Sequence, residues 1–470
     1  MIKFGTDGWR GLIARDFTFD NVRLVAMAAA KLIKKMSGGK DGSAVIGYDT
    51  RFLSGEFARE TALVFASQGI KSYLTDKCSS TPQVSWHTKE KNVTLGIIIT
   101  ASHNPAVYNG FKLKGAYGGP ATPEMIAELE AELKDVMNNP FELILDAYEN
   151  YKNEGLIELF DAKAPFVSYI RSKIDLDKIN AAGFKILYDP MHGAGIDTIR
   201  ELIPNADEIH GEYNPSFGDL DHPEPIGEVL TTLSERVKEG GYDLGLATDG
   251  DADRLGAMDE EGNFVDSHRI FMILLKYLYE IKGERGIVVK TVSLTSMVNK
   301  YCEKMGIELH ETPVGFKYTA KLMTEQKVII GGEESGGLGT ALHIPERDGL
   351  FNAMLLLEAM TSRKMSLKQM TDELDAEFGV HRYRRRDVVV TTAQKSAILS
   401  AAENAPKKLG RFDVISINKA DGYKFMVENG WLLIRASGTE PLIRFYAEAD
   451  SIEKVDELLD EGFALSCNGK

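Results

Sequence analysis

Cysteine is scarce in this sequence, which contains only Cys78, Cys302 and Cys467. These residues lie far apart and form no CxxC pair, so neither a zinc cluster nor a disulfide framework is indicated, and the count suits a reducing compartment. Long apolar runs are absent as well: no segment approaches the ~20 residues of a membrane-spanning helix, and the N-terminus has none of signal-peptide length. We therefore expect a cytoplasmic protein that does not bind a membrane.

Basic residues are outnumbered, with 55 Lys and Arg against 70 Asp and Glu, which gives a formal net charge of −15. This balance excludes a general nucleic-acid binder, because binding to a polyanion requires a basic surface. Hydrophobic residues make up 43% of the 470 residues, which is enough for packed cores, and a chain of this length is too long for a single core. A globular protein of several domains is expected.

Apolar segments of strand length alternate with amphipathic segments of helix length, which is the pattern of α/β layers around a mostly parallel sheet. Three units resemble one another, because the strands expected at 43–49, 184–189 and 286–290 are each followed by a polar turn and a helix. The starts of these strands are separated by about 140 and then about 100 residues. We infer three related α/β domains.

The pattern changes from His381 onward. Strand-like segments there surround a helix expected at 391–405, and Asp-Gly at 421–422 and Asn-Gly at 429–430 are typical of tight turns between antiparallel strands. The predicted fold class is therefore α/β: three related α/β domains with mixed, mostly parallel sheets plus a C-terminal α+β domain. The expected boundaries are 1–150, 151–255, 256–370 and 371–470.

Four loops contain residues suited to chemistry, and the first is 100–105 (TASHNP), directly after the apolar strand 95–99. Ser102 would lie where a strand of an open parallel sheet ends, which is the usual location of ligand chemistry. A serine hydroxyl becomes a good nucleophile only with help from a base or a metal, and His103 and Lys112 are near enough in sequence to assist. A helix cap or a turn before Pro105 explains this loop equally well.

The second loop, 249–254 (DGDADR), follows the apolar run 244–247. Its carboxylates, Asp249, Asp251 and Asp253, can crowd together cheaply only if a cation neutralises them, and oxygen ligands suit magnesium or calcium. The loop does not match an EF-hand, because Arg254 stands at the sixth position, where the EF-hand has a glycine, and a strand rather than a helix precedes the loop. We favour Mg²⁺ bridging a phosphate over a solvated acidic turn.

Two further loops contain small residues that let a ligand approach the backbone. In 331–337 (GGEESGG), Glu333 and Ser335 are two residues apart, so their side chains could point the same way and hold vicinal hydroxyls of a sugar ring. A flexible glycine-rich turn is the alternative. The loop 435–441 (RASGTEP) offers backbone N–H groups, hydroxyls and a guanidinium group to a phosphate, with a structural turn as its alternative. No GxxxxGK[ST] occurs, so a nucleoside triphosphate is not the expected ligand.

Together, the loops resemble those of the α-D-phosphohexomutase superfamily, which contains the phosphoglucomutases and phosphomannomutases. The resemblance spans the whole chain and rests on GTDGWRG at 5–11, TASHNP at 100–105, NGFKL at 109–113, DGDADR at 249–254, GEESGG at 332–337 and RASGTEP at 435–441. It implies four domains around a central cleft, each of which contributes one loop.

The resemblance also implies roles for the matching residues. Ser102 would carry the transferable phosphoryl group, and Asp249, Asp251 and Asp253 would hold Mg²⁺ together with that phosphoserine. Arg10 and Arg254 would contact the same phosphate, whereas His103 and Lys112 match positions for proton transfer or positioning. The substrate would be bound by Lys317, Glu333, Ser335, Arg435, Ser437, Gly438, Thr439 and Arg444.

The function implied is an isomerase that interconverts hexose 1-phosphate and hexose 6-phosphate, of glucose and/or mannose, through a hexose 1,6-bisphosphate that also acts as activator. The partner is a phosphosugar, and the protein would be a monomer or a homodimer. Phe316 stands where some relatives carry histidine, and GEESGG differs from the GEQSGH-like loop of phosphoglucosamine mutases, which favours glucose or mannose. Phosphoglucosamine mutase, a Mg²⁺-dependent sugar-phosphate phosphatase and a catalytically silent binding protein are the alternatives, the last opposed by the intact TASHNP and DGDADR motifs.

Overall fold

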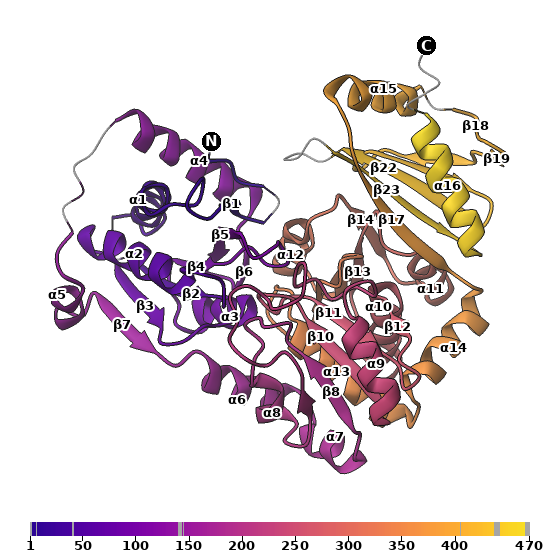
Figure 1. Cartoon of the computed structure of the whole chain (residues 1–470), viewed down its shortest axis with the longest axis horizontal. Helices are drawn as coiled ribbons and strands as arrows, with labels where there is room; N and C mark the ends of the chain where they lie inside the picture. Colours follow the sequence, from indigo (N-terminus) through magenta and orange to yellow (C-terminus); the bar gives the residue numbers. More distant parts are fainter. Residues whose placement is uncertain are drawn as a thin grey trace. The chain divides into compact units, whose positions relative to one another are not determined.

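The computed structural model describes residues 2–5, 7–39, 42–139, 143, 145–404, 406–436 and 442–465. These residues belong to two compact units (Figure 1). The larger unit comprises Met1–Arg285 and Phe316–Met370, and the smaller unit comprises Gly286–Gly315 and Thr371–Lys470. Among the described helices, none combines the length and the apolar composition needed to cross a membrane.

The N-terminal sheet of the larger unit is mixed. Its strands in spatial order are β1 (Trp9–Leu12), β5 (Tyr108–Gly115), β4 (Leu95–Ile99), β2 (Ser43–Tyr48), β3 (Lys71–Thr75) and β7 (Ile157–Phe160), with β6 (Gly119–Pro120) beside β5. The pairs β4–β2, β2–β3 and β3–β7 are parallel, whereas β5 is antiparallel to both β4 and β1. Every residue of β4 is buried, as expected for a strand with helices on both faces.

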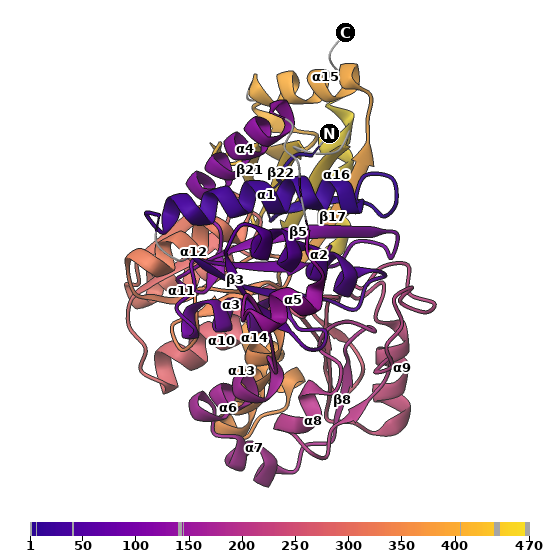
Figure 2. The same ribbon diagram turned by 90° about the vertical axis from the view of Figure 1, so that its left-hand side faces the viewer.

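Helices cover both faces of this sheet. Ile46 and Ile97 belong to the main core, whereas their neighbours Val45 and Ile98 pack against Val84 on the opposite face, because successive strand residues point in opposite directions. The helices of this region are α1 (Phe19–Met36), α2 (Ser54–Ser67), α3 (Thr81–Glu90), α4 (Pro123–Asn138) and α5 (Tyr148–Asn153). Helices α1 and α4 lie side by side, and α3, which contains Val84, covers the face opposite the main core (Figure 2).

The second sheet of the larger unit has the order β12 (Phe264–Val265), β11 (Leu255–Met258), β10 (Leu244–Thr248), β8 (Ile186–Asp189) and β9 (Asp207–Glu208). Strands β9, β8 and β10 are parallel, and β11 turns back antiparallel to β10. The reversal between β10 and β11 is the segment that carries the acidic loop. The accompanying helices are α6 (Lys163–Lys173), α7 (Leu176–Ala182), α8 (Thr198–Leu202) and α9 (Thr231–Gly240).

The rest of the larger unit supplies the glycine-rich loop. Strands β15 (Val328–Gly332) and β16 (Leu338–Thr340) pair antiparallel on either side of that loop. The neighbouring helices are α10 (Ser267–Lys276), which continues as the π-helical turn η1 (Tyr277–Ile281), α12 (Phe316–Glu325) and α13 (Gly349–Arg363). Helix α14 (Leu367–Phe378) contains the point at which the chain passes from one unit to the other.

The smaller unit contains an antiparallel sheet in the order β17 (Arg382–Val389), β23 (Leu442–Ala449), β22 (Gly430–Ala436), β21 (Tyr423–Val427) and β20 (Ser416–Asn418). Leu432, Ile434 and Phe445 of this sheet pack against Leu458 and Leu459. The unit also contains β13 (Ile287–Thr291), α11 (Met297–Met305), β14 (Leu309–Thr312), α15 (Thr392–Glu403), β18 (Lys408–Leu409), β19 (Phe412–Asp413) and α16 (Ile452–Ala464). The predicted fold class, including the C-terminal α+β domain, is confirmed.

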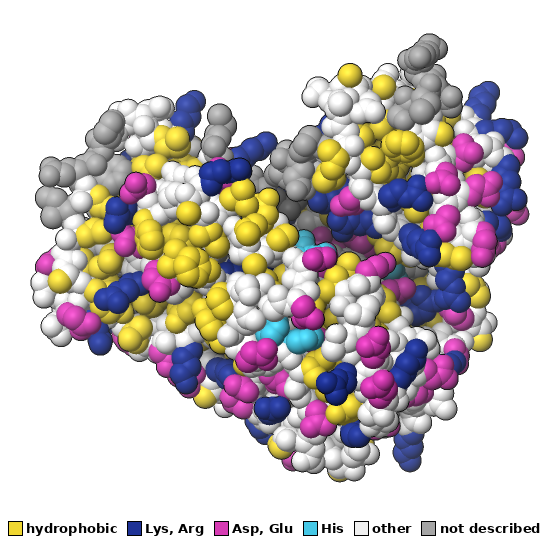
Figure 3. Space-filling view, in the orientation of Figure 1, with side chains coloured by type: hydrophobic (Ala, Val, Ile, Leu, Met, Phe, Trp, Pro, Cys, Tyr) yellow, Lys and Arg dark blue, Asp and Glu magenta, His cyan; other side chains and the backbone are white. Residues whose placement is uncertain are grey.

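The three predicted repeats are also found, because β2, β8 and β13 precede α2, α8 and α11. Residues 286–315, however, group with the C-terminal residues rather than with the rest of the predicted third domain. Two hydrogen bonds join them to that sheet: the backbone N–H of Ser296 donates to Glu448 at 3.1 Å, and the buried Lys424 Nζ donates to the carbonyl of Val292 at 2.7 Å. On the face drawn in Figure 3, Lys and Arg side chains are interspersed with Asp and Glu side chains.

Candidate active site

The serine loop lies at the end of β4 and is held in an unusual backbone conformation. Ser102 has φ +54°, in the left-handed region that non-glycine residues seldom occupy, and only 1% of its surface is exposed. Its backbone N–H donates to Thr100 Oγ1 at 2.9 Å. Backbone strain of this kind persists only where the surroundings enforce it, which is typical of functional sites.

Arg51 is the residue that enforces this conformation. Its fully buried guanidinium donates to the carbonyl oxygens of Ser102 at 2.5 Å, Asn104 at 2.6 Å and Pro105 at 2.9 Å. Asp49 pairs with the same guanidinium at 3.1 Å, so the charge of Arg51 is compensated. The serine loop is therefore held by a set of buried and partly buried hydrogen bonds from Arg51.

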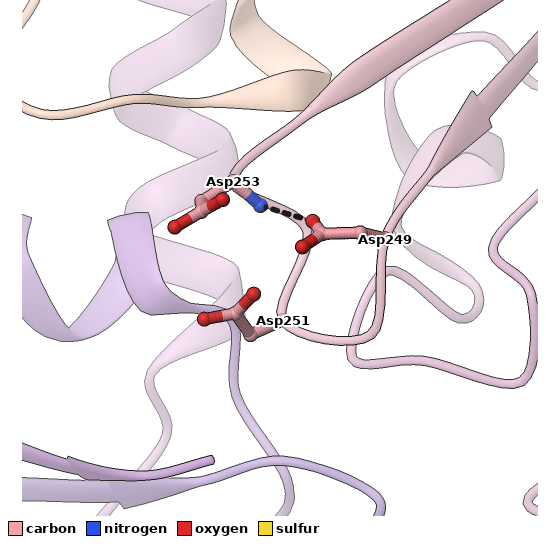
Figure 4. Close-up of side chains that lie close together, drawn as sticks. All are labelled: Asp249, Asp251 and Asp253. Carbon is pink, nitrogen blue, oxygen red and sulfur yellow. Dashed lines mark hydrogen bonds between the residues drawn. The ribbon is translucent and has the colours of Figure 1, made fainter. Parts of the chain in front are cut away.

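The acidic loop at the end of β10 brings its three aspartates together beside this serine. All three side chains are buried, and they point toward one another across the loop (Figure 4). Ser102 Oγ donates a hydrogen bond of 2.7 Å to Asp249 Oδ2. The other oxygen of Asp249 accepts from the backbone N–H groups of Asp253 at 2.9 Å and Arg254 at 3.1 Å. The predicted meeting of serine and carboxylates across 147 residues of chain is thus observed.

The carboxylates have the donor set that a hard divalent cation requires. One oxygen from each of Asp249, Asp251 and Asp253 lies within 4.8 Å of the others. Asp251 Oδ1 and Asp253 Oδ1 are buried and have no hydrogen-bond partner among the described residues. Burial and the charges of Asp251 and Asp253 raise the pKa of Asp249 well above its usual range. Unpaired carboxylate oxygens of this kind fit Mg²⁺, so the three residues could hold a metal ion.

Lys112 on β5 supplies a buried cation to the acidic loop. Its Nζ lies 2.8 Å from Asp7 Oδ2, 2.8 Å from Asp251 Oδ2 and 3.5 Å from Asp253 Oδ2. Burial opposes the charged form, but the carboxylates of Asp251 and Asp7 raise the pKa of Lys112 above its usual value. The ammonium of Lys112 in turn lowers the pKa of Asp251 below its usual range, although burial acts in the opposite direction. Lys112 is therefore a positive charge held between Asp7 and Asp251.

The predicted phosphate-contacting residues adjoin the same loops. Arg254 is 7% exposed, and its Nη1 donates to Glu224 Oε1 at 2.7 Å while its Nε lies 3.9 Å from Asp249 Oδ2. Arg10 donates to the side-chain oxygen of Asn104, two residues beyond the serine. His103 Nδ1 lies 3.4 Å from Ser102 Oγ. The imidazole of His103 therefore lies beside the serine hydroxyl, and Arg254 and Arg10 contact the two loops that meet there.

The glycine-rich loop 331–337 is connected to the acidic loop through Arg347. Arg347 contacts Glu333 Oε2 at 3.2 Å, Asp7 Oδ2 at 2.6 Å and Asp253 Oδ2 at 2.5 Å. Burial raises the pKa of Glu333, which is 4% exposed. The half-buried Ser335 follows in the same turn. Arg347 thus links Glu333 to Asp253 of the acidic loop.

Lys317 lies in the first turn of α12 and is half-buried. The residue before it, Phe316, is 3% exposed, and the guanidinium of Arg347 lies 5.7 Å from the centre of its ring. The phenyl ring at this position therefore packs against the guanidinium of Arg347.

The predicted phosphate clamp belongs to the smaller unit. Arg435 on β22 and Arg444 on β23 are directly opposite each other in an antiparallel pair, so their side chains share one face of the sheet. Arg435 pairs with Asp421 at 2.6 Å and Arg444 with Asp387 at 3.3 Å. The remaining predicted members, Ser437, Gly438 and Thr439, lie outside the described residues.

Sequence reasoning missed four residues that hold the site together: Asp7, Arg51, Glu224 and Arg347. Asp7 lies in the GTDGWRG motif, from which only Arg10 was predicted to act in the site. The others stand in no motif, and each acts on a loop at least 30 residues away, as Glu224 does on Arg254. Only the fold could bring them to the site.

Comparison with known proteins identifies four consecutive family models. They are described as domains I, II and III and the C-terminal domain of phosphoglucomutase/phosphomannomutase, and they match residues 1–140, 164–262, 266–378 and 387–465.

Curated relatives match along nearly the whole chain. A phosphoglucomutase/phosphomannomutase of Thermococcus kodakarensis is 30% identical, and a phosphoglucosamine mutase of Carboxydothermus hydrogenoformans is 32% identical, each over 98% of both chains. The crystal structure of a Thermus thermophilus protein assigned as a phosphomannomutase superposes with a TM-score of 0.86 at 31% identity, covering 99% of this chain and 98% of that one.

Proposed function

We propose that this chain, which belongs to the phosphoglucomutase/phosphomannomutase family and is thus an intramolecular phosphotransferase, interconverts the 1-phosphate and 6-phosphate of glucose and/or mannose through a phosphoserine at Ser102. The observation that carries the proposal is the 2.7 Å hydrogen bond from Ser102 Oγ to Asp249, inside a buried group of carboxylates. A hydroxyl at this place, once phosphorylated, would set its phosphate among Asp249, Lys112 and Arg254.

The proposed reaction begins with the phosphorylated serine. The P–O bond to Ser102 Oγ breaks and a P–O bond to the free hydroxyl of a hexose monophosphate forms, which gives a hexose 1,6-bisphosphate. The hydroxyl loses one proton and Ser102 Oγ regains one, so the step is balanced. His103 is placed to move a proton, with its Nδ1 3.4 Å from Ser102 Oγ. Return of the other phosphate to Ser102 completes the isomerisation without water.

Charge stabilisation is the main contribution of the remaining residues. Asp249, Asp251, Asp253 and the serine oxygen would hold Mg²⁺, which when bound neutralises the spread charge of a phosphoryl group. Lys112, which is buried beside Asp251, would place a positive charge next to the transferred phosphoryl group. Arg254 would contact the phosphate through its Nε, and Arg10 would support the loop through Asn104.

Substrate binding is proposed for the two remaining loops. Glu333 and Ser335 would hold sugar hydroxyls, and Lys317 would contact the substrate phosphate. Arg435 and Arg444 form a pair of guanidinium groups on one sheet face, which suits a phosphate that is not being transferred. Ser437, Gly438 and Thr439 would complete this clamp. Hexose 1,6-bisphosphate would act as an activator because it can phosphorylate Ser102 again after the intermediate escapes.

The proposal also concerns which hexose phosphate is the substrate. The loop GEESGG favours glucose or mannose, whereas several relatives are phosphoglucosamine mutases, so glucosamine is the alternative. Steady-state rates with the 1-phosphates of glucose, mannose and glucosamine, each with the 1,6-bisphosphate present, distinguish these sugars. We expect kcat/KM to be highest for glucose or mannose, and a clear preference for glucosamine would reverse the assignment.

A phosphatase would use water as the acceptor at the same serine. Inorganic phosphate measured in the same assays separates the two reactions, because a mutase releases far less phosphate than the amount of sugar phosphate it isomerises. Phosphate released in proportion to substrate consumed would show that water is the acceptor.

A further inference from the structure

The two carboxylate oxygens of Asp251 are used differently. Oδ2 accepts a hydrogen bond of 2.5 Å from Thr81 Oγ1 and one of 2.8 Å from Lys112 Nζ. Oδ1 is buried and has no hydrogen-bond partner among the described residues. Because a carboxylate that faces a cation must offer a free oxygen, Oδ1 is the oxygen of Asp251 available to a metal ion.

Thr81 is held rigidly in the place from which it donates. It is the first residue of α3, and Ser80 closes a capping box with Gln83 through hydrogen bonds of 3.3 Å and 3.2 Å. Thr81 and Asp251 are both fully buried. The hydroxyl of Thr81 has a single proton, and the structure assigns it to Asp251 Oδ2.

A second bond joins the same two residues. The backbone N–H of Thr81 donates to the carbonyl oxygen of Asp251 at 2.9 Å. The start of α3, which belongs to the N-terminal sheet, is therefore attached to both the main chain and the side chain of an acidic loop 170 residues further along. Loss of the hydroxyl alone would leave the main-chain bond in place and remove one of the two hydrogen bonds that hold Asp251 Oδ2.

Asp253 resembles Asp251 in having one oxygen held and one without a partner among the described residues, whereas the second oxygen of Asp249 accepts from Ser102 Oγ. Asp249 Oδ1 accepts two backbone N–H groups, and Asp253 Oδ2 accepts from Arg347 at 2.5 Å. Each aspartate thus has one oxygen fixed by the protein. Of the side chains that fix an oxygen of Asp251 or Asp253, Thr81 can be changed without altering the charge of the site, whereas Lys112 and Arg347 cannot.

We propose that Thr81 is a positioning residue for the metal: its hydroxyl holds Asp251 Oδ2, presents Oδ1 to the ion and thereby sets the affinity of the site for Mg²⁺. This inference rests on the proposed role of Asp249, Asp251 and Asp253 in holding Mg²⁺. Hydrogen-bond partners of metal ligands typically change metal affinity by about 10- to 100-fold when they are removed. Thr81 touches neither the substrate nor the reacting atoms, so its effect on turnover would follow from metal occupancy.

Three variants test the proposal by isothermal titration calorimetry with MgCl₂ as the titrant and protein freed of serine phosphate. Thr81→Val keeps the shape and the backbone N–H but loses the hydroxyl, and Thr81→Ser keeps the hydroxyl. Thr88→Val is the matched control, because Thr88 is buried in the same helix and its hydroxyl donates to the carbonyl of Val84 at 2.7 Å, away from the acidic loop. We expect Thr81→Val to weaken Mg²⁺ binding about 10- to 100-fold, with the other two variants within about twofold of the native dissociation constant.

The outcomes separate this inference from the function on which it rests. If the native protein binds no Mg²⁺, the metal assignment of the three aspartates is wrong, and the role of Thr81 is lost with it. If the native protein binds Mg²⁺ and Thr81→Val binds it equally well, or if Thr81→Ser weakens as much as Thr81→Val, the positioning role alone is wrong. Should Thr81→Val lose its native circular dichroism spectrum, Thr81→Ala takes its place with the same expected loss.

Discussion

Replacing Lys112 by methionine removes the buried cation that the acidic cluster depends on. Lys112 is 1% exposed and lies 2.8 Å from both Asp7 and Asp251. At an effective dielectric constant of about 20, one such contact is a gross attraction of about 6 kcal/mol, most of which offsets the desolvation of the two ions. The structure therefore predicts that Lys112→Met removes the counter-charge that lies nearest to Asp251 and one of the two that contact Asp7.

The net cost follows from what remains. Breaking a buried ion pair by removing one partner costs about 3–5 kcal/mol. Arg347 still lies 2.6 Å from Asp7 and 2.5 Å from Asp253, so we expect the lower end of this range, about 3 kcal/mol. At roughly 1–2 °C per kcal/mol for a unit of this size, the unfolding temperature of the larger unit in EDTA should fall by about 3–6 °C.

Magnesium should restore much of this loss. An ion present at about 100 times its dissociation constant adds about 2.7 kcal/mol to the stability of the native protein. The gain should be larger in Lys112→Met, because the ion no longer meets the repulsion of the ammonium. Differential scanning calorimetry with EDTA and with Mg²⁺ measures both quantities.

Lys114→Met is the matched control for this experiment. Lys114 lies two residues further along β5, is equally buried and pairs with Glu346 at 2.6 Å, outside the acidic loop. We expect a comparable loss of stability in EDTA but a gain from Mg²⁺ no larger than that of the native protein. The reasoning would be refuted if Lys112→Met melted like the native protein in EDTA, or if Mg²⁺ stabilised the two variants equally.

Two further predictions concern other parts of the chain. Burial lowers the pKa of Lys424 to about 7, so between pH 7 and about 10 the unfolded chain binds more protons than the folded one, and the free energy of unfolding of the smaller unit should rise with pH. The free energy of unfolding measured in urea should be higher at pH 9.5 than at pH 7 in the native protein, and this difference should be absent in Lys424→Met. If the difference persists in the variant, another group causes it. Glu224→Gln removes the charged partner of Arg254, whose hydrogen bond is worth about 1.5–3 kcal/mol, so kcat/KM should fall by roughly 10-fold or more with an unchanged circular dichroism spectrum. An unaltered kcat/KM would mean that Glu224 does not orient the guanidinium.

Much of the fold followed from local sequence patterns. The apolar run 95–99 is β4, and the run 244–247 begins β10, because buried parallel strands consist of continuous apolar residues. The turns at Gly422 and Asn429 have the positive φ angles that Asp-Gly and Asn-Gly pairs permit. Periodicity does not contain information on how separate elements pack, so the grouping of 286–315 with the C-terminal sheet could not be predicted.

The candidate site was predicted where a motif carried the chemistry and missed where a single residue acts across the fold. Ser102 and the three aspartates stand in loops after strands, and the structure brings the aspartates together and places Asp249 in contact with Ser102. Arg51 and Arg347 are isolated arginines with no distinguishing neighbours in sequence, and their roles follow only from the carbonyls and carboxylates that they reach. The sequence around Thr81 indicates only the start of a helix, and its hydrogen bond to Asp251 follows from the fold.

The measurement that tests the central claim most directly is the location of the phosphoryl group on the active protein. Protein incubated with glucose 1,6-bisphosphate, then digested and analysed by tandem mass spectrometry, should carry phosphate on Ser102, and Ser102→Ala should carry none and be inactive. Phosphate confined to another residue in fully active protein would contradict the account.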